Sequence, residues 1–300
     1  MNEYIRAYEY EKNVNPPMLQ NPIVQKNIDE CEYGITFIDF SEVFRCEYKA
    51  TSPNLLASFI KIKTGEFIHT KNQGDNNSIN ATSHLFFIIN GSCDLIFDNY
   101  ILYGSPGAIV ISPMFDSIRI NNTGSEDLYI YYINDSPLVN YLGNRPVKKL
   151  FKPAVYTEEF LVTNLDNLSN PNNNRKGILL SNKDTEKIGT NTITPVLWAL
   201  YNELPPDTIQ SPHKHNSVAL DLCISCEDSE NIYTLMGEEL DESGNIIDPI
   251  KVHWKTGEMF ITPPGLWHSH NNMGETYAYI LPIQDAGLLL YQRILGINLT

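Results

Sequence analysis

The chain has 300 residues, 42% of them hydrophobic and 11% aromatic, which suffices for one large or two ordinary domains. A formal net charge of −15 disfavours nucleic acids and anionic membranes as partners, because contacts to phosphate need a basic surface. The sequence contains no apolar run of roughly 18 residues, so it predicts no membrane span. The N-terminus is polar and does not resemble a secretory signal. Five cysteines without regular spacing are typical of a reducing compartment, so we expect a cytoplasmic protein.

Residues 1–50 predict an N-terminal arm, and residues 51–140 predict a first barrel of short strands. Pro16, Pro17 and Pro22 break any helix early in the arm. From residue 51 onward, apolar or alternating runs follow one another with turn signals between them, such as Asn90-Gly91. Many short strands at this spacing are typical of an antiparallel sandwich or barrel, so we expect an all-β fold.

Residues 141–195 predict a connector, and residues 196–300 predict a second barrel. In the connector we expect one helix near 157–164, a solvated loop at Asn170–Asn174 and no catalytic residue, so that it acts as a linker with a packing arm. The second barrel includes an exposed acidic insert at 237–249, which could be a lid, an oligomer contact or an inert loop. Cys223 and Cys226 lie in one of its strand-like runs, where a spacing of three predicts opposite faces.

An internal repeat relates the two barrels. The run 107–113 (Gly-Ala-Ile-Val-Ile-Ser-Pro) aligns without a gap with 257–263 (Gly-Glu-Met-Phe-Ile-Thr-Pro). In the continued alignment Ile118 corresponds to His268 and Ile120 to His270. We therefore expect the first barrel to be filled with apolar side chains and to hold no metal, and the second barrel to hold one.

Four of the seven histidines form two short His-x-His motifs, His213/His215 and His268/His270. In a strand, side chains at i and i+2 point to the same face, so each motif directs two imidazoles into one space. Two such strands that face each other would place three or four imidazoles around one point. Neutral imidazole is the commonest metal ligand and suits iron, zinc, copper and nickel.

The residues around these histidines resemble the cupin superfamily, and specifically the two-domain bicupins. The second cupin motif, Pro-x-Gly-x-x-His-x-x-x-Asn, matches in full at Pro263, Gly265, His268 and Asn272. The first motif matches at its two histidines, but Ala219-Leu220 occupies the region of the family's glutamate. The resemblance covers about residues 50–300. It implies two double-stranded β-helix (jelly-roll) barrels with a few short helices.

Over the second barrel the sequence is similar to the gentisate 1,2-dioxygenase branch, which includes salicylate- and hydroxynaphthoate-cleaving enzymes. The shared pattern is His-Arg-His (here 213–215, with lysine in the middle), Ala-Leu (219–220) and Trp-His-x-His-x-Asn (267–272). The resemblance implies Fe(II) held by His213, His215 and His268, with Zn, Mn or Ni as alternatives, in a dimer or tetramer. Two departures stand out. The metal barrel is the second one here, and Asp221 replaces an arginine that can hold a carboxylate, which argues against gentisate itself.

Alternation along the strands adds His270 and Asp221 to the candidates for the site, and two further residues could reach the pocket. His270 faces the same way as the ligand two residues before it, so it is a candidate acid or base, or a structural hydrogen-bonding group. Asp221 shares the inward face with the ligands and could move protons or bind substrate. Tyr233 and Gln284 are candidates for substrate contact. Trp267 is expected to point outward and pack.

These observations predict a non-haem Fe(II) dioxygenase that oxygenates or cleaves a small hydroxylated aromatic ring, with or without an amino substituent. Its partners would be that small molecule and O2. One alternative keeps the metal as a Lewis acid in an isomerase, lyase or hydrolase. The other is a cupin that binds a small molecule without turnover.

Overall fold

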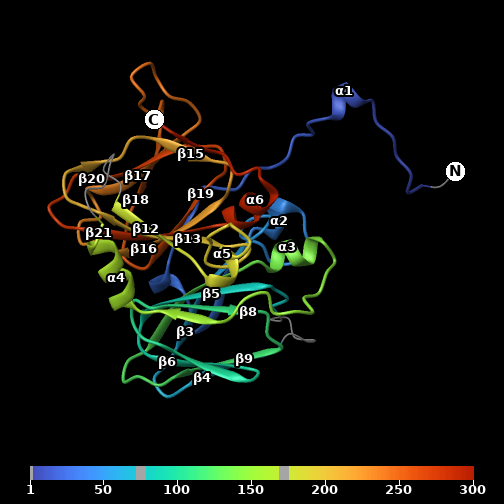
Figure 1. Ribbon diagram of the computed structural model, residues 1–300. Coiled ribbons are helices and arrows are strands. Elements are labelled where there is room, and N and C mark those ends of the chain that lie inside the picture. The colour runs from blue at the N-terminus through green and yellow to red at the C-terminus, as the bar shows by residue number, and fades with distance from the viewer. Residues whose placement is uncertain (1–2, 72–78, 169–175) are drawn as a thin grey trace.

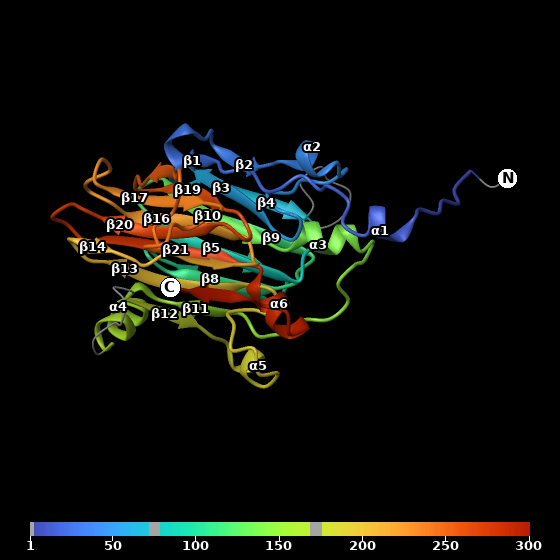
Figure 2. The same cartoon turned by 90° about the horizontal axis from the view of Figure 1, so that it is seen from above.

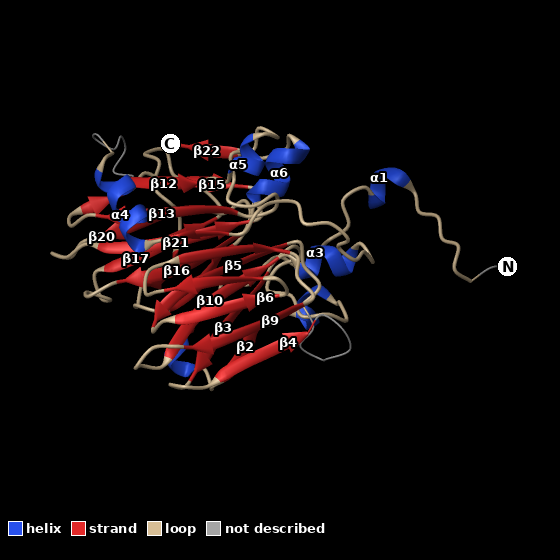
Figure 3. Cartoon of the chain, turned by 60° about the horizontal axis from the view of Figure 1, so that its bottom comes forward, coloured by secondary structure: helices blue, strands red, loops and turns tan. Residues whose placement is uncertain are grey.

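The computed structural model describes residues 3–71, 79–168 and 176–300. Strands dominate, and they form two adjoining barrels with short helices at their ends and edges (Figures 1 and 3). Residues 3–20 are exposed, and α1 (Tyr10–Asn13) stands away from both barrels (Figure 2). Among the described residues, no helix is both long and apolar enough to cross a membrane.

The N-terminal barrel consists of two antiparallel sheets with the strand orders β11-β8-β5-β10-β3-β2 and β4-β9-β6-β7. Its strands are β2 (Gly34–Ile38), β3 (Leu56–Ile62), β4 (Phe67–Lys71), β5 (Ser83–Asn90), β6 (Cys93–Phe97), β7 (Tyr100–Gly104), β8 (Ile109–Pro113), β9 (Ser117–Asn122), β10 (Leu128–Asn134) and β11 (Ala154–Tyr156). Its short helices are α2 (Ser41–Phe44) and α3 (Ser136–Tyr141), and a 3-10 turn, η1 (Ile28–Glu30), precedes it.

The C-terminal barrel has the strand orders β1-β19-β16-β21-β13-β12 and β18-β17-β20-β15-β22, and β14 also pairs with β20. Its strands are β1 (Gln25–Asn27), β12 (Lys176–Leu180), β13 (Trp198–Leu204), β14 (Thr208–Ile209), β15 (His213–His215), β16 (Ala219–Ser225), β17 (Ile232–Gly237), β18 (Ile250–His253), β19 (Glu258–Thr262), β20 (Trp267–Asn272), β21 (Ala278–Gln284) and β22 (Ile297–Leu299). Helix α6 (Ala286–Gln292) follows β21. The acidic insert forms a mostly exposed loop between β17 and β18, closed by a Leu240–Ile246 bridge.

The two barrels exchange strands. β1, from the N-terminal arm, pairs with β19 of the C-terminal barrel, whereas β11, from the connector, pairs with β8 of the N-terminal barrel. The next strand of the arm, β2, pairs with β3 of the N-terminal barrel. The next strand of the connector, β12, pairs with β13 of the C-terminal barrel. The arm and the connector are therefore equivalent parts of the repeat, and each contributes backbone hydrogen bonds to both barrels.

The connector holds more regular structure than the predicted linker with one helix. The expected helix is present as α4 (Glu158–Asp166), and Thr157 caps it by accepting a hydrogen bond from the Phe160 backbone. The connector also contains β11, β12 and α5 (Lys183–Glu186), which are too short for their periodicity to show in the sequence. The solvated loop expected at Asn170–Asn174 lies outside the described residues.

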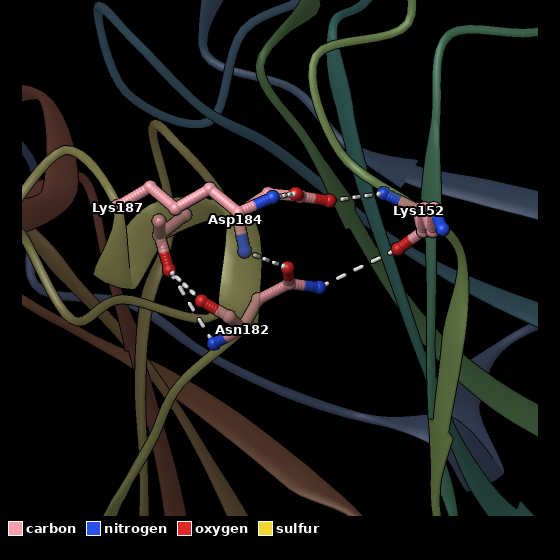
Figure 4. Close-up of polar contacts among 5 residues, drawn as sticks. Lys152, Asn182, Asp184 and Lys187 are labelled. Carbon is pink, nitrogen blue, oxygen red and sulfur yellow. Dashed lines mark hydrogen bonds and ion pairs between the residues drawn. The ribbon is translucent and has the colours of Figure 1, made fainter.

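A small polar network fastens α5 to the start of the connector (Figure 4). The Asn182 side chain caps α5 by accepting from the Asp184 backbone, and its amide donates to the Lys152 carbonyl at 3.4 Å. The Asp184 carboxylate accepts from the Lys152 backbone at 3.1 Å and from Lys187 Nζ at 2.6 Å. These contacts hold together two segments about thirty residues apart, and nothing in them points to chemistry.

β16 shows how the core is divided between the two faces of a sheet. Leu220 and Leu222 belong to the large apolar cluster that joins the two barrels, whereas Cys223 belongs to the cluster inside the C-terminal barrel. Both faces are buried, which explains the continuous apolar run in this strand. A register shift after Cys223 lets Cys226 pack against the same interior cluster. The prediction that the two cysteines lie on opposite faces is therefore wrong, because it assumed a regular strand.

The structure confirms the internal repeat. Three pairs of elements begin at the same offset: β9 at residue 117 and β20 at 267, β10 at 128 and β21 at 278, and α3 at 136 and α6 at 286. Asn122 and Asn272 make the same hydrogen bonds: each amide donates to two backbone carbonyls, and each accepts from a glycine backbone two residues later. The last strand-turn-strand of each barrel is thus built in the same way.

Apolar side chains fill the interior of the N-terminal barrel. Ile118 and Ile120 are buried where the C-terminal barrel has histidines, and Phe86 takes the register position of Asp221. The cavity that remains among them measures about 10 Å³. One histidine, His84, is buried there, but it lies against Phe115 with 4.2 Å between ring centroids and shares a hydrogen bond with the Tyr132 hydroxyl.

Candidate metal centre

β15 and β20 place the two His-x-His motifs side by side. The strands pair in antiparallel register at His213 and His268. Pro264-Gly265 forms the turn before β20, with Gly265 in the left-handed region (φ 83°) that favours glycine. The Gly265 backbone donates to the His215 carbonyl at 2.8 Å, so this turn also fixes β20 against the far end of β15.

Three of the four imidazoles converge. His213, His215 and His268 each offer a nitrogen, and these ligand atoms lie within 4.8 Å of one another. The His268 ring is central, with centroid distances of 4.0 Å to His213 and 4.9 Å to His215. His270 lies further out, 5.9 Å from His268 and 6.1 Å from His213 between ring centroids. The structure therefore brings together the three histidines that the sequence proposed as ligands.

Backbone carbonyls set the tautomer of two of these rings. His215 Nδ1 lies 2.9 Å from the Ser217 carbonyl, and His268 Nδ1 lies 3.0 Å from the Leu266 carbonyl. A carbonyl can only accept, so in both rings Nδ1 donates and Nε2 keeps its lone pair. Hydrogen bonding of this kind from the outer nitrogen is usual for metal-ligating histidines.

Burial keeps the imidazoles in the neutral form that a metal requires. It lowers the pKa of His215, and it lowers the pKa of His268 well below its ordinary value. The neighbouring rings of His213, His215 and His270 lower the pKa of His268 further. Three converging imidazoles, of which His215 and His268 are held neutral with an oriented lone pair, form a donor set that fits a divalent transition metal.

The Nδ1 atom of His270 meets a side-chain hydroxyl instead of a backbone carbonyl. The Trp254 indole N–H donates to Thr234 Oγ1 at 2.8 Å, and the same Oγ1 lies 2.8 Å from His270 Nδ1. The indole can only donate, so it occupies one acceptor position of Thr234 Oγ1; we infer that the hydroxyl proton goes to Nδ1 and that His270 carries its own proton on Nε2. In this arrangement His270 is a hydrogen-bond donor to the cavity, which distinguishes it from His215 and His268.

We expect Thr234→Val to lower the free energy of unfolding by about 1–3 kcal/mol, because it leaves the buried Trp254 N–H and His270 Nδ1 without their partner. Thr234→Ser keeps the hydroxyl and should remain close to the wild type. Urea unfolding of the three proteins measures the difference. ¹⁵N NMR of histidine-labelled protein should show the Nε2 proton of His270 in the wild type and in Thr234→Ser. An unchanged tautomer in Thr234→Val would contradict the role of this hydroxyl.

The converging histidines open into a cavity of about 320 Å³. Its polar part contains the four imidazoles with Asp221, Gln284, Gln210 and Asn202. Its other walls are mostly apolar and come from β12, β13 and β22, including Ile178, Leu179, Trp198, Leu200, Ile297 and Leu299. A largely apolar cavity with a few convergent polar groups is typical of a small-molecule site.

The C-terminal strand β22 closes one side of this cavity. It pairs with all three residues of β15, and the pairing places Leu299 beside His213 and Ile297 beside His215. Thr300 adds a hydrogen bond from its hydroxyl to the Pro212 carbonyl at 2.8 Å. β22 therefore holds the strand that carries two of the histidines, and it supplies apolar wall on the same side.

Asp221 lines the cavity and is almost completely buried. Thr262 donates to its Oδ2 at 2.6 Å, which fixes the orientation of the carboxyl group. Burial raises the pKa of Asp221 to about 7, and the Thr262 hydrogen bond offsets this only in part. Gln284 also lines the cavity, and Ser217 donates to its Oε1 at 2.7 Å. Asp221 therefore occupies the position that alternation predicted, and Gln284 reaches the cavity as expected.

Tyr233 lies outside this cavity. Thr234, the next residue in β17, makes the inward hydrogen bond to His270, so alternation turns Tyr233 to the outer face. There Lys251 Nζ lies 3.7 Å from the centre of its ring. We therefore remove Tyr233 from the candidate substrate contacts. Trp267 is also outward, with Lys214 over its ring.

Sequence reasoning missed several residues that complete the site. Thr234 and Trp254 orient His270, and Thr262 orients Asp221. These residues lie on neighbouring strands that the sequence does not pair. Alternation could have placed Thr234 on the inward face, but only strand register shows which side chain it meets.

Comparison with known proteins identifies the fold. No family model matches the sequence, and no curated protein matches it. Salicylate 1,2-dioxygenase from Pseudaminobacter salicylatoxidans matches with a TM-score of 0.65 and 13% identity, over 83% of this chain and 76% of its own. Its adduct with gentisate gives a TM-score of 0.71 at 11% identity, over 96% and 87% of the two chains. A variant of that enzyme with gentisate bound gives 0.72 at 12%, over 96% and 88%.

At these identities the likeness shows the fold, and it confirms the predicted one: the chain is mostly β and has the two-barrel jelly-roll fold of these structures.

Proposed function

We propose that this bicupin chain is a metal-dependent dioxygenase that holds non-haem Fe(II) through His213, His215 and His268. Its reaction would oxygenate or cleave a small hydroxylated aromatic ring. The observation that carries the proposal is the convergence of three imidazole nitrogens at one cavity. The fold shared with salicylate 1,2-dioxygenase supports it.

When bound, Fe(II) would supply open coordination positions and a redox-active centre at which a chelating substrate and O2 can meet. The chain's own residues would orient the ligands and shape the cavity. Buried carbonyl contacts from Ser217 and Leu266 hold two imidazoles in the ligating tautomer. The apolar walls around β12, β13 and β22 exclude water and confine an aromatic ring.

His270 is the candidate proton donor. Its Nδ1 is fixed by Thr234, so its Nε2–H can donate to a substrate oxygen or to oxygen-derived charge that develops in the cavity. Asp221 is the second candidate for proton movement, because its pKa of about 7 lies close to neutral pH. The cytoplasmic location and the homo-oligomeric state remain predictions.

The direct test is oxygen consumption by protein purified without chelator and reconstituted anaerobically with Fe(II). We expect uptake with a catechol-, gentisate- or aminophenol-like compound, dependent on Fe(II) and lost in His213→Ala. His69→Ala, in the other barrel, is the matched control. Stoichiometric zinc, manganese or nickel with no oxygen uptake on any of these compounds would replace the proposal with Lewis-acid chemistry.

A further inference from the structure

The cavity contains two residues with formal charge besides its imidazoles, among the residues that the structure describes: Asp221 and Lys176. They differ in how their charge is balanced. A substrate's own charge must be compatible with whichever of these groups lacks a partner of opposite charge. The contacts of the two side chains therefore limit the class of substrate.

The positive charge of Lys176 is already compensated. Its Nζ lies 2.8 Å from Glu203 Oε1 and 3.8 Å from Asp166 Oδ1. Glu203 is buried and also accepts a hydrogen bond from the Tyr279 hydroxyl at 2.9 Å, so this carboxylate is firmly placed. A substrate carboxylate at Lys176 would have to compete with Glu203 for the ammonium group.

Asp221 has no basic partner among the described residues. The hydrogen bond to its carboxyl group comes from the neutral Thr262 hydroxyl. Its strand neighbours across β19 and β21 are Phe260 and Pro282, which bring no charge. A substrate carboxylate placed beside Asp221 would meet a like charge in a buried site, whereas an N–H or O–H group would meet an acceptor.

The size and walls of the cavity describe the rest of the molecule. An engineered apolar cavity of about 150 Å³ holds benzene, and this cavity of about 320 Å³ is roughly twice as large. Most of its apolar wall lies on β12, β13 and β22, on strands other than the one that carries Asp221; Ala219 and Pro282 are the apolar residues of the lining on β16 and β21. A single ring with an apolar substituent, or two fused rings, would fit with its polar edge toward the histidines.

We propose that the substrate is an aromatic ring with a hydroxyl group and an adjacent amino or second hydroxyl group, without a carboxylate, and that Asp221 accepts a hydrogen bond from that adjacent group. This inference rests on the proposed function, because the adjacent pair is also what would chelate the metal. It selects the o-aminophenol and catechol class over the 2-hydroxybenzoate class.

The test compares ligands that differ at one position of the ring: 2-aminophenol, catechol and salicylate. Calorimetric titration of the Fe(II)-loaded protein without oxygen measures binding independently of turnover. We expect 2-aminophenol, catechol or both to bind at least about tenfold more tightly than salicylate, a difference of about 1.4 kcal/mol or more. Asp221→Asn, which is almost isosteric, should reduce this ratio, because it removes the negative charge and weakens the acceptor.

Three outcomes would overturn the inference: tighter binding of salicylate by the wild type, an unchanged ratio in Asp221→Asn, or no binding of 2-aminophenol or catechol by iron-loaded protein. The wild-type comparison decides even if the variant does not fold. The proposed function fails in a different way, through a lack of iron uptake or through the absence of oxygen consumption by protein that does bind these ligands.

Discussion

His268→Ala is expected to abolish stoichiometric binding of a divalent metal and, with it, all metal-dependent oxygen uptake. His268 is the central ring, within 4.9 Å of both His213 and His215 between centroids. Loss of a group that merely orients a ligand typically costs 10–100-fold in metal affinity, so loss of this ligand should cost more than about 100-fold. Titration with Co(II) or Fe(II), together with metal analysis of the purified protein, measures the effect.

His253→Ala is the matched control for this substitution. His253 is an exposed histidine at the end of β18, outside the cavity, and its Nδ1 contacts the Ser229 carbonyl. We expect it to bind metal with wild-type stoichiometry. Circular dichroism of both variants should show that the barrels remain folded. Undiminished metal binding by a folded His268→Ala protein would contradict the proposed centre.

Asp221→Asn should change the pH dependence of stability of the metal-free protein by roughly 4 kcal/mol, at about 1.36 kcal/mol per pKa unit. The pKa of Asp221 is raised from 3.8 to about 7 in the folded protein, mainly by burial. Between these two values the folded chain retains a proton that the unfolded chain releases. The contribution of Asp221 to the free energy of unfolding therefore falls as pH rises from about 4 to about 7.

The variant lacks this titration, so the stability of Asp221→Asn relative to the wild type should increase from about pH 4 to pH 7 and then level off. Urea unfolding of chelator-treated protein across this range measures it; a bound cation would lower the pKa of Asp221 and obscure the effect. Asp285→Asn is a useful comparison, because burial raises the pKa of Asp285 to about 6 and its change should end earlier. A pH-independent difference for Asp221→Asn would mean that the folded protein does not hold this proton.

Much of the fold was predictable because its signals are local or repeated. The short strands expected between residues 51 and 140 and the helix expected near 157–164 are found where the sequence placed them. The connector was not predictable to the same degree. β11 has only three residues, and it forms by pairing with β8 at the edge of a sheet in the N-terminal barrel. No local sequence pattern indicates this pairing.

The site shows the same division. Period-two alternation correctly placed Asp221 on the cavity side. The same rule failed at Cys226, where a bulge in β16 shifts the register. Tyr233 was also a candidate for substrate contact, but its strand neighbour Thr234 is the residue that faces inward.

By itself the sequence determined the all-β repeat, the identity of the three converging histidines and the contrast between an apolar barrel and a histidine-bearing one. Those features depend on residue types at fixed spacings. In a strand, residues two apart point to the same face, so the spacing alone shows which side chains share a face. Only the tertiary structure decided which hydrogen-bond partner each imidazole meets. His215 and His268 face carbonyls and His270 faces a hydroxyl because of how strands distant in the chain are paired. That pairing arises from packing of the whole barrel, and it decides which partner the Nδ1 atom of each of these three rings meets.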